Sequence, residues 1–204
     1  MNFEPPVEFL LKALAEDSAA RVLLIDAGSG SIRWANAIAL DAYTPEEGVL
    51  IGAPPTSFLP DGISADWMAA ADESRVVNGP VILDMIVRGV AVRTTFRPFP
   101  GTNPPLVLAV GTTAYHRAMD DDVPVRAAST ADLGALASLT PRERQIIGLI
   151  GDGLTSAAIA ERLERSIKTI EWHRVSIGQK LGVKSRVELA GLARRAGLCS
   201  TPAL

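Results

Sequence analysis

Residues 139–198 read LTPRERQIIGLIGDGLTSAAIAERLERSIKTIEWHRVSIGQKLGVKSRVELAGLARRAGL, and their pattern decides the fold of this part of the chain. The segments Thr140–Glu143 and Ser185–Glu188 are capping boxes, in which a hydroxyl and a glutamate three residues later satisfy the first free N–H groups of a helix. Thr155 and Ser166 are suited to cap two further helices between these boxes. Apolar residues recur at helical spacing after each cap. The stretch therefore predicts four short helices that share one small core.

The predicted third helix, roughly residues 167–181, has two different faces. At 100° per residue, one side carries Ile170, His173, Arg174, Ile177 and Leu181. The other side carries Lys168, Glu171, Trp172, Val175 and Gln179. A tryptophan and a valine are unusual on a face that is exposed to water, but this face suits the major groove of DNA. There a carboxylate can accept a hydrogen bond from cytosine N4, and apolar groups can contact thymine methyls. The second and third helices also have the spacing of a helix-turn-helix, which places one helix in that groove.

The same stretch resembles the C-terminal helix-turn-helix domain of LuxR/FixJ-type transcription regulators. The residues that carry the resemblance are Leu139–Glu143, Gly153, Ile159-Ala160, Leu163, Ser166, Thr169-Ile170, His173 and Lys180–Val183. The resemblance implies a four-helix DNA-binding domain that reads two half-sites as a dimer. The family commonly has lysine where this chain has Glu171 and an aliphatic residue where it has Arg174. These differences leave the expected fold unchanged and bear on which DNA sequence is recognised.

We predict a DNA-binding site and a dimerisation surface in this domain. The predicted DNA-binding residues are Lys168, Thr169, Glu171, Trp172, Arg174, Val175, Lys180, Ser185 and Arg186. Thr169, Lys180 and Arg186 are expected near the phosphates, because they flank the reading face. The predicted dimerisation residues on the fourth helix are Val187, Ala190, Gly191 and Arg194. Small residues allow two helices to approach closely, and the resembled family pairs its DNA modules through this helix.

The sequence does not assign a role to three residues of this domain. His173 faces the apolar side by spacing, so a packed or phosphate-touching imidazole is favoured over a pH switch. Gly148 and Gly178 lie inside predicted helices, where each costs about 1 kcal/mol relative to alanine. The sequence alone offers no reason for these two glycines.

Charge divides the chain near residue 137. Residues 1–137 hold 9 Lys+Arg and 17 Asp+Glu, a net charge of −8, and residues 138–204 hold 11 and 6, a net charge of +5; their sum is the −3 of the whole chain. A basic module joined to an acidic one suits a DNA reader carried by a domain that avoids phosphates. Ordinary scatter of surface charge explains the value of +5 equally well.

Residues 20–116 alternate strands and helices. Strands are predicted at Arg21–Asp26, Ser31–Ala35, Val81–Val87, Val90–Arg97 and Leu106–Thr113, short helical pieces between Asn36 and Leu59, and a longer helix at about Ser64–Val77. This order resembles a PAS sensor domain, as do the stretches Asp26…Gly30-Ser31-Ile32…Ala35-Asn36 and Ile51-Gly52. The predicted fold class is therefore an α+β PAS-like domain followed by an all-α four-helix helix-turn-helix domain.

The predicted domain organisation has four parts: an N-terminal helix at 1–19, the PAS-like sensor domain at 20–116, a linker at 117–137 and the LuxR-type domain at 138–204. The N-terminal part is amphipathic over residues 5–16, which suits either covering a domain or a dimer contact. The linker contains three aspartates at 120–122 and lacks apolar periodicity, which favours a solvated tether. A short helix at Asp132–Ser138 is expected to lead into the DNA module.

Several other kinds of functional site are disfavoured because residues that they require are missing. The Gly28-Ser29-Gly30 stretch is not a dinucleotide-binding loop, because Arg33 stands where the third glycine is required. A phospho-receiver domain requires a lysine late in its sequence, and Lys12 is the only lysine before residue 168. The histidines, His116 and His173, form no zinc spacing, and neither suits an axial haem ligand in the sensor domain. Cys199 lies far from that domain in sequence, which argues against a flavin-thiol photosensor. We predict no cofactor, leave the ligand of the PAS-like domain unknown, and assign no enzymatic activity.

The sequence thus predicts a cytoplasmic, homodimeric, sequence-specific DNA-binding regulator of transcription. Its predicted partners are double-stranded DNA, a second copy of the chain and, as a further candidate, RNA polymerase. No apolar run is long enough to span a membrane and no signal-peptide pattern opens the chain, so no membrane partner is expected. Two alternatives remain: a protein-binding adaptor that uses the helical module for protein contacts, and a front domain with an unrecognised catalytic activity.

Overall fold

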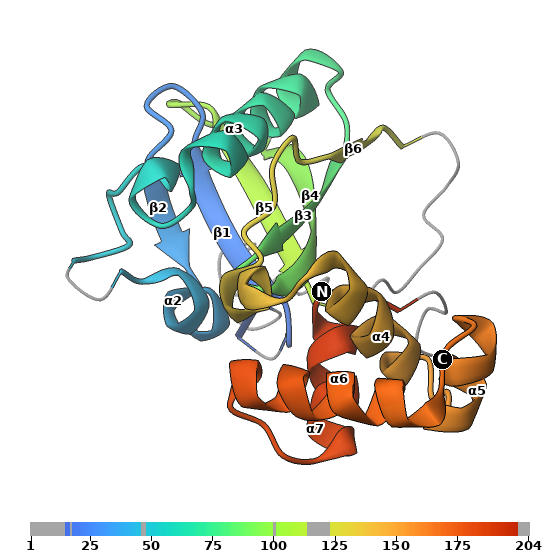
Figure 1. Ribbon diagram of the computed structural model, residues 1–204. Helices are drawn as coiled ribbons and strands as arrows, with labels where there is room; N and C mark the ends of the chain where they lie inside the picture. Colours follow the sequence, from blue (N-terminus) through green and yellow to red (C-terminus); the bar gives the residue numbers. More distant parts are fainter. Residues whose placement is uncertain (1–14, 17, 46–47, 100, 114–122, 200–204) are drawn as a thin grey trace, which may run out of the picture. The chain divides into compact units, whose positions relative to one another are not determined.

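The computed structural model describes residues 15–16, 18–45, 48–99, 101–113 and 123–199 (Figure 1). Contacts between residues divide the chain into two compact units, one built on a β-sheet and the other on the C-terminal helices. Within the described ranges, no helix is both long and apolar enough to cross a bilayer. The predicted amphipathic helix at 5–16 lies outside the described residues except for its last two positions.

The first unit contains a six-stranded mixed sheet with the strand order β2-β1-β5-β4-β3-β6. The strands are β1 (Arg21–Asp26), β2 (Ile32–Ala35), β3 (Val81–Val87), β4 (Val90–Phe99), β5 (Leu106–Thr112) and β6 (Val125–Ala127). Between β2 and β3 the chain forms the helices α2 (Ala37–Tyr43), η1 (Pro55–Ser57) and α3 (Asp61–Val76). Two strands, helices and three strands therefore follow in the predicted order, which confirms the α+β class and agrees with the PAS resemblance of residues 20–116.

The core of this unit lies between α3 and one face of the sheet. Trp67 of α3 contacts Phe96 of β4 edge to face, with ring centroids 5.1 Å apart, and both side chains are fully buried. The helix α3 begins three residues earlier than predicted, directly after Pro60. Ser64 lies within the first turn of this helix, where its hydroxyl donates to the carbonyl oxygen of Asp61 at 2.8 Å.

The predicted tether at 117–137 contains a strand that apolar periodicity could not reveal. The strand β6 runs parallel to β3, with Val125 opposite Ile82, and all three of its side chains are exposed. Next to it, Ser129 donates from its backbone N–H and its hydroxyl to Asp66 of α3, at 2.6 and 2.7 Å. Backbone and polar hydrogen bonds thus hold this segment to the sheet, and its sequence carries no alternating apolar pattern.

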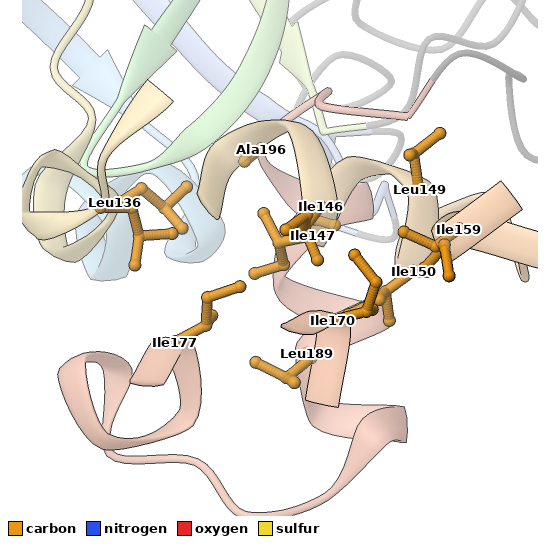
Figure 2. Packing of buried hydrophobic residues seen from close by; sticks show 13 residues of the cluster. Leu136, Ile146, Ile147, Leu149, Ile150, Ile159, Ile170, Ile177, Leu189 and Ala196 are labelled. Carbon is orange, nitrogen blue, oxygen red and sulfur yellow. The ribbon is translucent and has the colours of Figure 1, made fainter. Parts of the chain in front are cut away.

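The second unit contains the four predicted C-terminal helices. They are α4 (Pro141–Gly151), α5 (Ser156–Arg162), α6 (Ile167–Leu181) and α7 (Arg186–Arg195), preceded by the 3₁₀ helix η2 (Gly134–Ser138). All four predicted N-caps are present, with complete capping boxes at α4 and α7. Figure 2 shows the isoleucine-rich core, in which buried side chains from all four helices pack together.

Two glycines that the sequence left unexplained allow close backbone approach in this unit. A Cβ at Gly178 would lie 2.6 Å from the carbonyl oxygen of Val183, and a Cβ at Gly148 would lie 2.5 Å from that of Leu198. Either contact is too short to exist, so a side chain would force the backbone apart. The glycine at 178 lets the turn after α6 fold back against that helix, which helps to fix its C-terminal end.

We expect Gly178→Ala to lower the free energy of unfolding of the helical unit by about 1–3 kcal/mol, because the overpacking outweighs the gain in helix propensity. Gly191 in α7 is the matched control, since a Cβ there would meet only the end of the Arg195 side chain, at 3.5 Å. Gly191→Ala should raise stability by up to about 1 kcal/mol. Urea unfolding followed by circular dichroism measures both, and equal effects would contradict this account of Gly178.

Candidate nucleic-acid interface

The helix α6 exposes an apolar and basic face. Trp172 and Val175 are 66% and 55% exposed, and Lys168 is exposed one turn before Trp172. On the opposite side of the helix, Ile170 and Ile177 are buried in the core of the unit. Large apolar side chains usually avoid water at such exposure. The two predicted faces of this helix are therefore present as expected.

The N-terminus of α6 is a second feature of this surface. Ser166 caps the helix by accepting from the backbone N–H of Thr169 at 3.1 Å, and the two hydroxyls lie 2.8 Å apart. Arg165 and Lys168 are exposed on either side of this cap. Free N–H groups and the helix dipole favour anions at such an end. Thr169 thus lies where a phosphate contact was predicted, with its hydroxyl engaged by the cap.

Glu171 is occupied by contacts within the protein. Its Oε1 accepts from the hydroxyl of Ser156, at the start of α5, at 2.6 Å, and its Oε2 lies 3.3 Å from the guanidinium of Arg174. The carboxylate therefore connects the two helices of the helix-turn-helix. The Glu171 side chain is still 41% exposed, so its remaining acceptor sites are open to a donor such as a cytosine.

Lys180 is bound to a buried carboxylate. Its Nζ donates to Oε2 of Glu143 at 2.6 Å, while the hydroxyl of Ser176 donates to Oε1 of the same residue at 2.8 Å. Burial alone would raise the pKa of Glu143, but the bonds from Lys180, Thr140 and Ser176 outweigh it and hold that pKa at about 2. Glu143 is thus a charged anchor between α4 and α6, and Lys180, predicted as a phosphate contact, is one of its partners.

The other predicted residues near the start of α7 also make internal bonds. Arg186 donates from Nη2 to the carbonyl oxygens of Gly153, at 3.2 Å, and Leu154. Ser185 caps α7 by accepting from the backbone N–H of Glu188 at 3.1 Å. The sequence pattern could indicate that these side chains lie near α6. It could not show that they already make hydrogen bonds within the protein.

A pocket of about 350 Å³ lies beside the C-terminal half of α6. Its walls are formed by Arg174, Val175, Gly178, Gln179, Gly182, Val183, Lys184 and Leu189. Gln179 and Lys184 were absent from the predicted site, although Gln179 falls on the outward face by spacing. Both are exposed, and both can donate to phosphates or base edges.

His173 of α6 is partly enclosed by the protein. His173 is half-buried beside Trp172, with ring centroids 5.1 Å apart, and its Nδ1 is buried without a hydrogen-bond partner among the described residues.

The predicted dimerisation residues form a strip along α7. Val187 is 82% exposed, and Ala190 and Gly191 are half-buried. Arg194 donates from Nε to the carbonyl oxygen of Gly151 at 3.2 Å. Most of the predicted strip thus remains accessible on a helix whose other face is in the core.

Comparison with known proteins places the helical unit in a family. Residues 137–193 match the family described as bacterial regulatory proteins, luxR family, which is not an enzyme class. The uncharacterized response regulatory protein YgeK of Escherichia coli (strain K12) is 48% identical over 62 residues, which cover 30% of this chain and 42% of YgeK. The transcriptional regulatory protein FixJ of Bradyrhizobium diazoefficiens is 45% identical over 64 residues, 31% of either chain. The chain therefore spans less than half the length of each of these relatives.

Among solved structures, a phage VqmA–DPO complex is similar over 95% of this chain and 91% of its own, with 17% sequence identity and a TM-score of 0.47. The family match itself falls on the helical unit, from the end of η2 to residue 193 of α7. It includes both capping boxes, the Glu143 anchor and the exposed face of α6. Residues 137–193 therefore form a helix-turn-helix domain of the LuxR family.

Proposed function

We propose that this chain is a sequence-specific DNA-binding regulator of transcription that reads DNA with α6. The observation that carries the proposal is the outward face of α6, where Trp172, Val175 and Lys168 are exposed in a unit of the LuxR family. An exposed tryptophan and valine can touch thymine methyls, and the lysine can reach a phosphate or a guanine. The name of the relative FixJ, a transcriptional regulatory protein, supports the same reading.

The contacts of the predicted residues suggest different roles for them. Trp172, Val175 and Lys168 are the best candidates for direct contact with DNA. Glu171 and Lys180 instead position α6, through Ser156 of α5 and Glu143 of α4. The capped N-terminus of α6 and the basic residues around it are suited to a phosphate.

A salt titration of DNA binding tests the proposal. The purified chain should bind fragmented genomic DNA with a logarithmic affinity that falls linearly with the logarithm of salt concentration, by about 0.9 per phosphate contacted. Lys168→Ala should weaken this binding and reduce the slope by about one, whereas Arg97→Ala, an exposed arginine of the sheet unit, should change neither. A chain that binds no DNA at any salt concentration would favour the adaptor alternative.

We further propose that two copies bind together through α7. Gly191 and Ala190 leave room for a second helix, and a two-fold axis there would bring each residue next to its own copy. Half-sites would then lie about 10 base pairs apart, centre to centre. A regulator bound at a promoter would also meet RNA polymerase there.

Gly191→Glu tests this pairing, because it would bring two carboxylates together across the axis. We expect the variant to lose cooperative binding to an operator with two half-sites and to keep near wild-type affinity for a single half-site. Gly191→Ala is the uncharged control and should retain cooperativity. If Gly191→Glu is as cooperative as the wild type, dimerisation takes place elsewhere in the chain.

For the sheet unit we propose a sensor role. Its order of strands and helices is the one that the PAS resemblance implies. A bound signal would change the arrangement of two sensor units and so the fraction of molecules whose α6 helices are spaced for binding.

A further inference from the structure

Two polar side chains of the sheet unit have buried atoms without partners. The Nε and Nη1 atoms of Arg21 and the hydroxyl oxygen of Thr94 are buried and make no hydrogen bond within the described part of the chain. Arg21 forms no ion pair with any described carboxylate, unlike Arg93 of the same sheet, which binds Asp84 through two hydrogen bonds of 2.6 and 2.7 Å. An uncompensated buried charge is costly, so this arginine calls for a partner.

The strand register places these two groups in one row. Arg21 of β1 lies opposite Gly111 of β5, and Thr94 of β4 lies opposite the same glycine from the other side. Directly opposed residues of antiparallel strands point to the same face of the sheet. A Cβ at Gly111 would lie 3.3 Å from the Thr94 hydroxyl oxygen and 3.6 Å from the Arg21 Cβ. The Cγ1 atom of Val92 would lie 3.3 Å from the same Cβ. The missing side chain at Gly111 thus leaves room for the side chains of Thr94, Val92 and Arg21 to meet over the strand.

This row lies on the covered face of the sheet. Phe96, two residues after Thr94, contacts Trp67 of α3, and the guanidinium of Arg21 lies over the ring of Tyr43 of α2, 5.6 Å from its centroid. Tyr43 is buried, and burial raises the pKa of its hydroxyl although the charge of Arg21 and a hydrogen bond with it act in the opposite direction. Tyr43 is thus a neutral polar neighbour of Arg21 and supplies no counter-charge. This face of the sheet therefore offers three kinds of donor along one row and the helix beside it: the guanidinium of Arg21, the hydroxyl of Thr94 and the phenol of Tyr43.

We propose that Arg21, Tyr43, Thr94 and Gly111 form a binding site for a small monoanionic carboxylate, which we name the Arg21 site. A planar carboxylate matches the geometry of a guanidinium, and its charge would compensate that of Arg21. A phosphate dianion would leave one negative charge unpaired in the same place, which burial disfavours. The inference rests on the proposed sensor role of the sheet unit and names the chemical class of its signal.

Acetate is the probe, and the full chain is the sample. We expect acetate to raise the thermal midpoint of the wild type in a saturable way, by a few degrees at about a hundred times its Kd. Sodium chloride at equal ionic strength, inorganic phosphate and the neutral isostere acetamide should raise it less or leave it unchanged. An equal response to chloride or phosphate overturns the carboxylate assignment, and an equal response to acetamide overturns the requirement for an anion.

Variants place the binding at the Arg21 site. Arg21→Met should abolish the acetate response, and the isosteric Thr94→Val should raise the Kd by roughly tenfold, as expected for one lost hydrogen bond to a charged ligand. Arg97→Met is the control, since this exposed arginine lies on β4 three residues from Thr94. If Arg21→Met fails to fold, Thr94→Val still decides, because a wild-type response in it contradicts the site.

The DNA affinity of the same preparations separates this inference from the proposed function. Acetate binding by a chain that binds no DNA would leave the Arg21 site standing and overturn the proposed regulator. DNA binding by a chain that ignores acetate would overturn the Arg21 site alone.

Discussion

Glu143→Gln should lower the free energy of unfolding of the helical unit by about 2–3 kcal/mol. Glutamine can still complete the capping box with Thr140, so the helix start is preserved while the charge is lost. The variant leaves Lys180 next to a neutral group and removes the acceptor of the Ser176 hydroxyl. Breaking a fully buried ion pair costs about 3–5 kcal/mol, and the partial exposure of Lys180 reduces that value here. Urea unfolding followed by amide exchange in α4 and α6 measures the change.

The second capping box of the chain provides the matched control. Glu188 occupies the same position in α7 that Glu143 occupies in α4, but it is exposed and binds only the cap and the backbone before it. Glu188→Gln should therefore lower the free energy of unfolding much less than Glu143→Gln does. If both variants lose equally little stability, the contacts between Glu143 and α6 do not stabilise the fold.

Acidification should remove the same contribution. The pKa of Glu143 is about 2 in the folded chain, below its ordinary value of 4.5, so its contribution is complete above about pH 5 and is lost as the pH falls toward 2. The difference in unfolding free energy between the wild type and Glu143→Gln should thus shrink by up to about 3 kcal/mol between pH 5 and pH 2. A difference that stays constant over this range would contradict the assignment of the charge.

Trp172→Ala should reduce discrimination between DNA sequences by about 1–3 kcal/mol, the usual contribution of one base contact. The physical reason is its position, since two thirds of this large side chain is exposed on the face of α6 opposite the core. Because the side chain contributes little to the core, stability should change by less than about 1 kcal/mol. Selection from randomised DNA, with the unfolding midpoint measured in parallel, gives both values.

Two further variants control for loss of exposed apolar surface. Trp172→Phe keeps an aromatic face and should retain part of the preference, and Val76→Ala removes a valine of α3 that is 85% exposed in the sheet unit. The Val76 variant should select the same sequences as the wild type. An unchanged preference in Trp172→Ala would mean that α6 is docked in a different register.

Local signals predicted most of the helical unit. Hydroxyl residues at N-caps, glutamates three residues later and isoleucines at helical spacing act within one or two turns, so the pattern at 139–198 was sufficient to identify four helices and both faces of α6. The same signals could not show that Glu143 binds Lys180, Glu171 binds Ser156 and Arg186 binds the loop before α5, because these partners lie far along the chain. Gly148 and Gly178 became understandable only through the carbonyl oxygens of Leu198 and Val183, which the fold brings next to them.

In the sheet unit, the strands that bury apolar side chains were predicted and β6 was missed. The strand β6 exposes Val125, Arg126 and Ala127, and its pairing with β3 depends on backbone groups that every sequence has. The proposed Arg21 site was equally invisible, because the row from Arg21 through Gly111 to Thr94 joins β1 to two strands that are far from it along the chain. Pairing between distant strands is information that local periodicity does not contain.

The most direct test of the account is the ratio of affinities of the purified chain for a duplex obtained by selection and for a scrambled duplex of the same length, measured at one salt concentration near physiological. A sequence-specific regulator should prefer the selected duplex by about 10³-fold or more. A ratio near one, with both duplexes bound weakly, would show that α6 does not read DNA sequence and would contradict the account.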